Sequence, residues 1–240
     1  MKILNYALAI ALAIPCYSFS NEQAINDKDY LDAVSILSKA QSSIEMYDRL
    51  AFSGGSEQDL ELNFKNYLFF SIEAIPALQR SAKQNNPAAQ YLLGVTLRTP
   101  FIPSSESAKM CELFNNSAAS GFLPAVFALG GSCPDSVDME GINKLLESAL
   151  SSNRSYSMYY PTQAIIYKFC TKNSPASLSL PMLDQQAFEA EGYYALARST
   201  RGTQISQLQI KFRYYEEAIA RGCEPAKALA AGVKEQINNL

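Results

Sequence analysis

The stretch that decides the fold is Ser81–Gly94, which reads SAKQNNPAAQYLLG, and its pattern returns at Ser117–Gly130, which reads SAASGFLPAVFALG. Five aligned positions are identical, and Tyr91 is matched by Phe127. Average composition would supply about one match by chance. A period in the thirties is typical of stacked helix pairs, each of which buries its apolar face against its neighbours. The sequence therefore predicts an all-α protein, an α/α solenoid of stacked antiparallel helix hairpins with about ten helices.

Two weaker copies extend this repeat, with windows that start at Asp184 and Ala218. The four starts are separated by 36, 67 and 34 residues, so the middle gap has room for two units. The missing unit would begin near Ser151, where no match is recognisable. We therefore expect an N-terminal capping helix region at 21–57 and a solenoid at 58–240, with a degenerate unit near 151–183.

Prolines and capping residues punctuate the predicted helices. Asp27 to Leu50 has the spacing of one long helix. The next helical stretch contains Pro76, which should kink or split it near Ala74 because proline has no N–H for the helix ladder. Asn86 can cap the following helix, with a proline at its first position.

The repeat resembles the Sel-one-like repeat (SLR) family, a relative of the tetratricopeptide solenoids, whose pattern is Ala-Ala-x-x-Gly-x-x-x-Ala-x-Tyr-x-Leu-Gly. Ser81–Gly94 and Ser117–Gly130 carry the resemblance most closely, and it covers roughly residues 58 to 237. The family has a Gly-x-Gly-Val loop between units, and here Arg98–Pro103 and Gly130–Val137 hold proline-containing loops instead. The resemblance implies a superhelix of helix pairs that binds other proteins.

The first twenty residues differ from the rest of the chain. Lys2 precedes an apolar run from Ile3 to Ile14, and Ser18 and Ser20 are the small residues of a cleavage site. We interpret residues 1–20 as a cleaved signal peptide, which predicts a periplasmic or secreted protein. A retained membrane anchor is the alternative, but this run is too short to span a bilayer. No other segment predicts membrane insertion.

Four cysteines follow the signal segment, and an even number in an oxidising compartment favours disulfides. If residues 104–120 and 122–132 form a hairpin, Cys111 and Cys133 lie ~15 and ~18 Å from its corner, at a rise of 1.5 Å per residue. We therefore expect a bridge from Cys111 to Cys133. A bridge from Cys170 to Cys223 follows only by elimination, and two buried free cysteines are the alternative.

The chain lacks the residues of most catalytic systems. It has no histidine, which excludes Ser-His-Asp and Cys-His nucleophiles and histidine-based zinc sites. No Gly-x-Gly-x-x-Gly or phosphate-binding loop is present, and no serine stands three residues before a lysine, so the Ser-x-x-Lys nucleophile is missing. With 20 basic and 23 acidic residues, the charge gives no footprint for nucleic acid. We predict no cofactor, no metal, no nucleic-acid partner and no enzymatic activity.

Tyrosines provide the candidate contacts for a partner. Adjacent tyrosine pairs on a helix place one ring inward and leave the other for a concave surface. The degenerate unit also gathers tyrosines beside an arginine, which indicates a binding insertion, although poor ordering is the alternative. The predicted partner-binding residues are Arg154, Tyr156, Tyr159, Tyr160 and Tyr214.

These features predict an exported, non-catalytic repeat protein that mediates a protein–protein interaction in the periplasm. A narrower form, which rests on the family resemblance alone, is an immunity protein that neutralises a secreted antibacterial effector such as a phospholipase. The partner could instead be an envelope component that holds this chain as a structural adaptor. An enzyme that acts on cell-wall or β-lactam substrates is the rival from another class.

Overall fold

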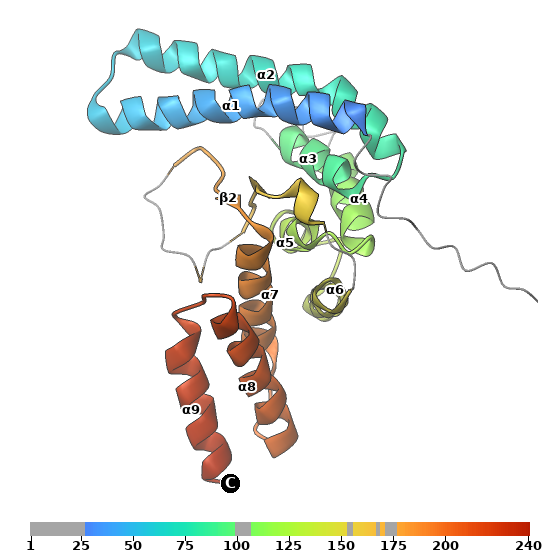
Figure 1. Ribbon diagram of the computed structural model, residues 1–240, viewed down its shortest axis with the longest axis vertical. Coiled ribbons are helices and arrows are strands. Elements are labelled where there is room, and N and C mark those ends of the chain that lie inside the picture. Colours follow the sequence, from blue (N-terminus) through green and yellow to red (C-terminus); the bar gives the residue numbers. More distant parts are fainter. Residues whose placement is uncertain (1–26, 99–106, 153–155, 167–168, 171–176) are drawn as a thin grey trace, which may run out of the picture.

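The computed structural model describes residues 27–98, 107–152, 156–166, 169–170 and 177–240. In this described part the fold is all-α apart from one two-stranded sheet, and Figure 1 shows the helices in chain order from blue to red. The predicted signal peptide and Arg154 lie outside the described residues. The helices are α1 (Lys28–Ser53), α2 (Glu57–Lys83), α3 (Pro87–Leu97), α4 (Ser107–Ala119), α5 (Leu123–Ser132), α6 (Met139–Ser151), α7 (Gln185–Ser199), α8 (Ile205–Ala220) and α9 (Ala226–Asn238).

The first hairpin is formed by two long helices, α1 and α2. Asp27 caps α1 by accepting a hydrogen bond from the backbone N–H of Tyr30, and Gly54 ends the helix in the left-handed conformation with φ 77°. Ser56 then caps α2 through the N–H of Asp59. These caps satisfy backbone groups that a helix end leaves without partners, so the boundaries follow local chemistry.

Helix α2 continues through Pro76 without a break, so the expectation of a split near Ala74 is wrong. Proline removes the hydrogen bond to the carbonyl of Ile72, four residues earlier. Ile72 is 58% exposed, which leaves that part of the helix open to water. Packing of the opposite face, where Ala74 and Leu78 are fully buried, holds the helix together.

Three helix pairs turn in the same way, at the positions that the repeat predicts. Asn85, Gly121 and Gly222 occupy equivalent places in their windows and have φ of 62°, 88° and 95°. Each turn repeats two hydrogen bonds, such as Cys223 N–H to the Ala218 carbonyl at 3.0 Å and Gly222 N–H to the Ile219 carbonyl at 2.9 Å. This pair of bonds is the Schellman motif, which ends a helix with one left-handed residue. The turns α2–α3, α4–α5 and α8–α9 are therefore copies of one structure.

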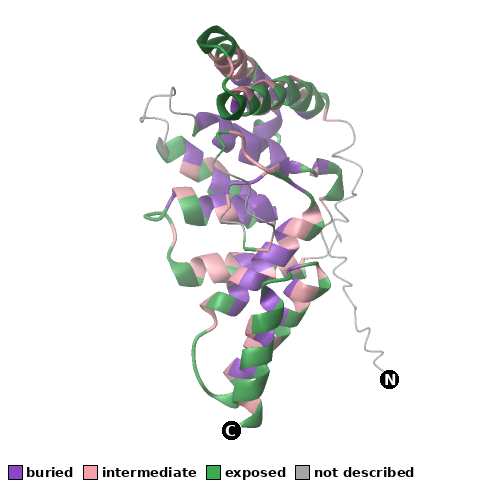
Figure 2. Cartoon of the chain, turned by 90° about the vertical axis from the view of Figure 1, so that its left-hand side faces the viewer, coloured by how far each residue is buried: buried purple, intermediate pink, exposed green. Residues whose placement is uncertain are grey.

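Each helix packs mainly on its neighbours in the sequence. The buried residues of the described part form two clusters, a large one that runs from α1 to α7 and a smaller one that joins α7, α8 and α9. Buried residues are purple in Figure 2, and exposed residues dominate both ends of the molecule. Helix α3 is buried along its whole length, and its Gly94 lies directly against the ring of Phe114 in α4. A small residue here lets the two helix backbones approach closely.

The third helix pair departs from the prediction. The middle gap, between the starts at Ser117 and Asp184, was expected to hold two helix units, but after α6 the described residues of that gap contain no further α-helix, and α7 begins only at Gln185. The window that starts at Asp184 also places its turn wrongly, because Asp184 is the N-cap of α7 and the helix runs unbroken to Ser199. Only the second half of that window is right, where Tyr194 and Ala197 are buried.

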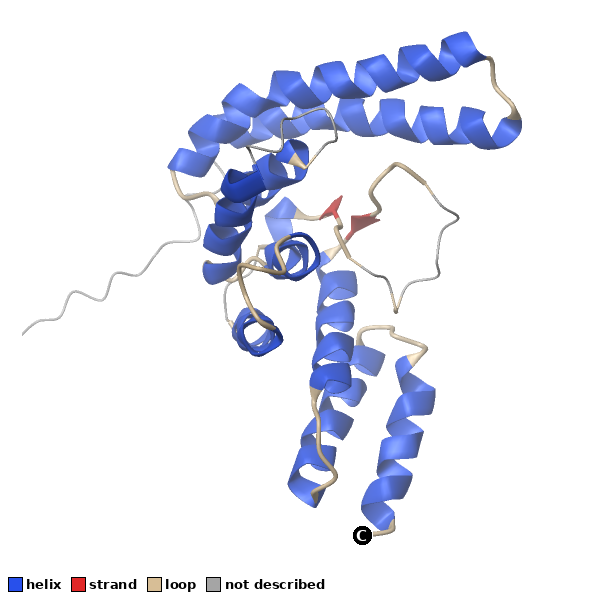
Figure 3. Ribbon diagram, turned by 180° about the vertical axis from the view of Figure 1, so that it is seen from behind, coloured by secondary structure: helices blue, strands red, loops and turns tan. Residues whose placement is uncertain are grey.

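A long connection replaces the tight turn between α6 and α7, and we call residues 152–184 the inserted segment. Helix α6 ends at Ser151, and its C-cap Ser152 has an extended conformation, so the chain leaves the helix without a tight turn. The segment contains a short 3-10 helix at Ser157–Tyr159 and two strands, β1 (Thr162–Gln163) and β2 (Met182–Leu183), which pair antiparallel. Figure 3 shows this strand pair, in red, between the α1–α2 hairpin and α7.

Candidate functional site

The inserted segment is bound to α1 through polar side chains. Asp48 accepts hydrogen bonds from the backbone N–H groups of Leu178 at 3.0 Å and Ser179 at 2.9 Å, and from the hydroxyl of Ser177. Burial raises the pKa of Asp48, but these bonds outweigh burial and the net pKa is lowered. Gln41 adds a bond from its side chain to the Leu180 carbonyl at 3.2 Å. Residues 177–180 of the inserted segment are therefore held along α1.

A second set of contacts joins the segment to α7 and to the last turn. Glu191 of α7 is 1% exposed and accepts bonds from the N–H groups of Phe169 and Cys170 at 2.9 Å. Cys170 lies at disulfide distance from Cys223 in the α8–α9 turn, with 2.05 Å between the sulfurs. This is the pairing that elimination suggested. The segment thus links the first helix of the chain to its last hairpin.

The other cysteine pair closes the second hairpin. Cys111 of α4 and Cys133, the C-cap of α5, have their sulfurs 1.98 Å apart and their Cα atoms 5.7 Å apart. The two positions are level along the hairpin because Gly121 turns the chain between them. The structure therefore has the cysteine pairing that helix geometry predicts.

The tyrosines of the inserted segment contribute to the core, which differs from the partner-binding role predicted for them. Tyr159 is 7% exposed and its ring meets Tyr30 of α1 edge-on, with 4.9 Å between centroids. Tyr156 and Tyr160 pack against Phe122 at 5.6 and 5.8 Å. Tyr159 is therefore not accessible to a partner. Tyr156 and Tyr160 keep partial exposure.

Tyr156 and Tyr160 line a small hollow of about 260 Å³, measured with the part that is open to solvent. Its walls come from the α4–α5 turn, α6, the inserted segment and α7. Gln185 and Glu189 supply the polar lining. The hollow is thus a partly aromatic depression with a carboxylate on its wall.

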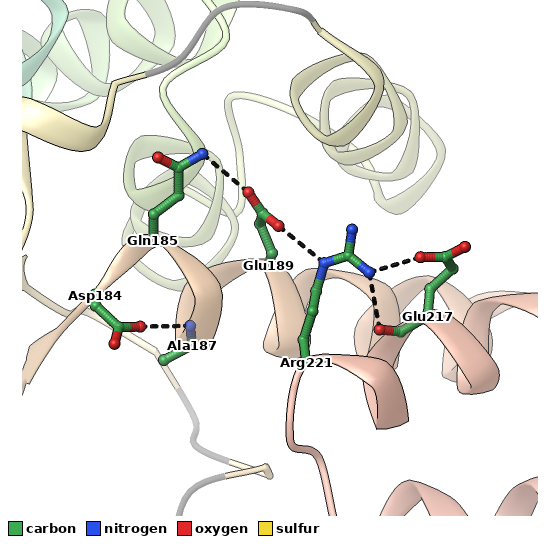
Figure 4. A network of polar contacts seen from close by, with 6 residues as sticks. All are labelled: Asp184, Gln185, Ala187, Glu189, Glu217 and Arg221. Atoms are coloured by element: carbon green, nitrogen blue, oxygen red, sulfur yellow. Dashed lines mark hydrogen bonds and ion pairs between the residues drawn. The ribbon is translucent and has the colours of Figure 1, made fainter.

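A polar network extends from this hollow across α7 and α8 (Figure 4). The Gln185 amide donates to one oxygen of Glu189 at 2.9 Å, and the guanidinium of Arg221 donates to the other at 2.8 Å. Arg221 also donates to the Glu217 carboxylate at 2.6 Å. Burial lowers the pKa of Arg221, but the bonds to Glu189 and Glu217 outweigh it and the net pKa is raised. Arg221 therefore stays charged and holds two carboxylates in place.

Two tyrosines continue the same surface. The guanidinium of Arg221 lies over the ring of Tyr193, 4.5 Å from its centroid. The ring centroids of Tyr214 in α8 and Tyr193 lie 6.3 Å apart, and the Tyr214 hydroxyl donates a hydrogen bond to the Glu147 carboxylate of α6 at 2.9 Å. Burial and the contact with Glu147 raise the pKa of Tyr214, so this phenol stays neutral. We call the whole set the aromatic–acidic surface, which comprises Glu147, Tyr156, Tyr160, Gln185, Glu189, Tyr193, Tyr214, Glu217 and Arg221.

The structure brings three of the five predicted partner-binding residues, Tyr156, Tyr160 and Tyr214, to this surface. Sequence reasoning missed Glu189 and Arg221, which join the inserted segment's hollow to α8. A helical spacing of Gln185, Glu189 and Tyr193 was available as a signal, because residues four apart share a helix face. Nothing in the sequence paired that face with Arg221, which is 32 residues from Glu189.

No group of three histidine, cysteine, aspartate or glutamate side chains that could hold a metal ion is present among the described residues. None of the described helices is both long enough and apolar enough to cross a membrane.

The described residues form an all-α protein with one two-stranded sheet, and its connection between α6 and α7 is tied both to α1 and to the turn between α8 and α9. Comparisons of the chain with protein-family models, with curated proteins and with solved structures find no match.

Proposed function

We propose that this chain is an exported, non-catalytic solenoid of helix hairpins that binds another protein through its aromatic–acidic surface. The single observation that carries the proposal is that four partly exposed tyrosines lie along one polar network, with Tyr193 and Tyr214 on the Arg221 side and Tyr156 and Tyr160 at the hollow that Glu189 lines. Tyrosine and arginine dominate the energetics of protein interfaces, because they offer large contact areas with a polar end. A ring or guanidinium that is already fixed by its neighbours loses little conformational entropy on binding.

The charges of this surface favour a partner that contributes a basic side chain. Glu147, Glu189 and Glu217 supply three carboxylates, whereas Arg221 and the neighbouring Arg213 supply two cations. The remaining negative charge complements a lysine or arginine. The hollow beside Glu189 has a carboxylate and tyrosine rings, groups that attract a cation.

Export and the solenoid arrangement are parts of the same proposal. The apolar run near the N-terminus and the two cysteine pairs at disulfide distance support an oxidising compartment such as the periplasm. The three identical turns and the sequential packing of the helices support a stack of hairpins. The absence of histidine from the sequence supports a binding role over hydrolytic chemistry.

Quantitative capture tests the proposal. The tagged protein would be incubated with the exported fraction of its source cells, and the bound protein measured against Tyr193→Ala and Arg221→Ala variants. Truncating a hot-spot side chain of an interface costs about 2 kcal/mol or more, roughly a thirtyfold loss of affinity, and the proposal makes Tyr193 and Arg221 such residues. We expect each variant to capture at least tenfold less partner protein than the unchanged chain.

Matched controls separate binding from folding. Tyr47→Ala and Arg49→Ala change the same residue types on α1, outside the aromatic–acidic surface, and should capture as much as the unchanged protein. Circular dichroism would check that all four variants remain helical. Equal capture by the Tyr193, Arg221 and control variants would refute the proposed surface.

A further inference from the structure

Helix α2 carries an exposed apolar stripe that packs on no other helix. Leu62, Phe69 and Ile72 are 55%, 62% and 58% exposed, and Pro76 is exposed beside them. Leu62, Phe69 and Pro76 are spaced seven residues apart, and Ile72 lies between the last two, so all four share one helix face. Figure 1 shows α2 along the outer edge of the molecule, with α1 and α3 on its other side. A stripe with heptad spacing is the seam through which one helix pairs with another.

The charges on this face are self-complementary about its centre, although Lys65 lies within the stripe, seven residues before Ile72, and only Glu73 lies beside it. If two copies of α2 pair antiparallel with Phe69 opposite Phe69, Lys65 of each copy lies opposite Glu73 of the other. The acidic first turn, with Glu57 and Asp59, then lies beside the last turn of the second copy, where Lys83 supplies the basic charge and Arg80 is already paired with Asp29 of its own α1 at 2.8 Å. Opposite charges at the flanks of a helix pair determine the partner and its orientation. Because Phe69 is close to the middle of α2, nearly the whole helix overlaps in this register.

We propose that α2 is the interface of a homodimer, in which two copies of this chain pair their α2 helices antiparallel about a two-fold axis through Phe69. A two-fold interface requires one patch to complement itself, and the stripe and the charges on its face do so. The dimer leaves the aromatic–acidic surface of each copy free, because that surface lies on α6, the inserted segment, α7 and the C-terminal part of α8, and includes no residue of α2. The inference is therefore independent of the proposed function.

Sedimentation of the purified protein tests the proposal. We expect a dimer for the unchanged chain and at least a tenfold weaker dimer for Phe69→Glu, which places two carboxylates at the centre of the seam. The control is Met139→Glu, because Met139 is 67% exposed at the start of α6 and should leave the dimer unchanged. A monomeric unchanged protein, or a dimer that Phe69→Glu does not weaken, overturns the proposal.

A charge-reversal experiment tests the orientation. In a dimer of Lys65→Glu, the new carboxylate at position 65 of each copy faces Glu73 of the other. In a dimer of Glu73→Lys, the new ammonium group at position 73 of each copy faces Lys65 of the other. Each single variant should therefore weaken the dimer at low ionic strength. An equimolar mixture restores both opposite pairs and should form a heterodimer. Lys65→Glu also removes an exposed pair with Glu61 within the helix, a contact that contributes little to stability. A mixture that dimerises no better than the single variants overturns the antiparallel register.

Discussion

Gly94 and Gly130 are the same position in the two copies of the repeat, yet the structure predicts opposite effects when each is changed to alanine. A Cβ atom at Gly94 would lie 2.5 Å from Cε1 of Phe114 and within 3.0 Å of two further ring atoms. The Phe114 ring is fully buried against Tyr91, so it has little room to move. At Gly130 the nearest atom is a methyl group of Ile142 at 3.5 Å, which is an ordinary contact.

The size of each effect follows from two opposing contributions. Overpacking a core costs ~1–3 kcal/mol, and three ring atoms at this distance place Gly94→Ala in the upper part of that range. Alanine stabilises a helix by up to ~1 kcal/mol relative to glycine, which offsets part of this cost. We therefore expect Gly94→Ala to destabilise the fold by about 2 kcal/mol, a fall in Tm of roughly 4–8 °C for a chain of this size. Gly130→Ala gains only the helical contribution and should raise Tm by roughly 2–4 °C.

Thermal and urea unfolding followed by circular dichroism at the helical band measures both variants on the oxidised protein. Each variant is the control for the other, because the chemical change and the repeat position are identical. If Gly94→Ala proves as stable as the unchanged protein, α3 and α4 do not approach as closely as described and the reasoning fails.

Two further predictions concern the cysteines and the acid dependence of stability. Peptide mapping without reduction should link Cys111 to Cys133 and Cys170 to Cys223. The first pair requires cleavage between its two cysteines, for example after Glu112 or Phe122, and a free Cys111 thiol would contradict the structure. Burial raises the pKa of Asp27, but bonds from Ser81 and Asn86 outweigh burial and hold it below its ordinary value of 3.8. The ionised form therefore stabilises the fold above that value, and this contribution is lost as the pH falls through the lowered pKa. The free energy of unfolding of Asp27→Asn should be lower than that of the unchanged protein at pH 6, and this difference should become smaller towards pH 3. A difference that stays constant from pH 6 to pH 3 would argue against this role.

Much of the helix pattern could be predicted from local chemistry. Asn86 accepts from the N–H groups of Ala88 and Ala89, as its position before a proline suggested. The turn residues at 85, 121 and 222 could be aligned because a Schellman turn requires one residue with positive φ, which glycine and asparagine tolerate. The expected split of the helix at Pro76 is wrong because tertiary packing on one face of α2 outweighs the lost hydrogen bond, whereas the expected kink stays a prediction.

The inserted segment was the least predictable part of the chain. Its position depends on contacts between residues that are distant in sequence, such as Asp48 with Ser179 and Tyr91 with the Gln163 carbonyl. The spacing between repeats gives only the number of residues between them. It cannot distinguish a degenerate helix pair from a connection of the same length. The tyrosine count likewise identified aromatic residues near the surface but not the burial of Tyr159, which Tyr30 and Phe122 determine.

Site-specific photo-crosslinking tests the central claim, that the aromatic–acidic surface holds a protein partner. A photoreactive phenylalanine analogue would replace Tyr193, which contacts Arg221, and in a control chain it would replace the exposed Lys234 of α9. Irradiation in the source cells should give one crosslinked species of defined mass from position 193 and none from position 234. Equal crosslinking at both positions, or none at position 193, would contradict the account.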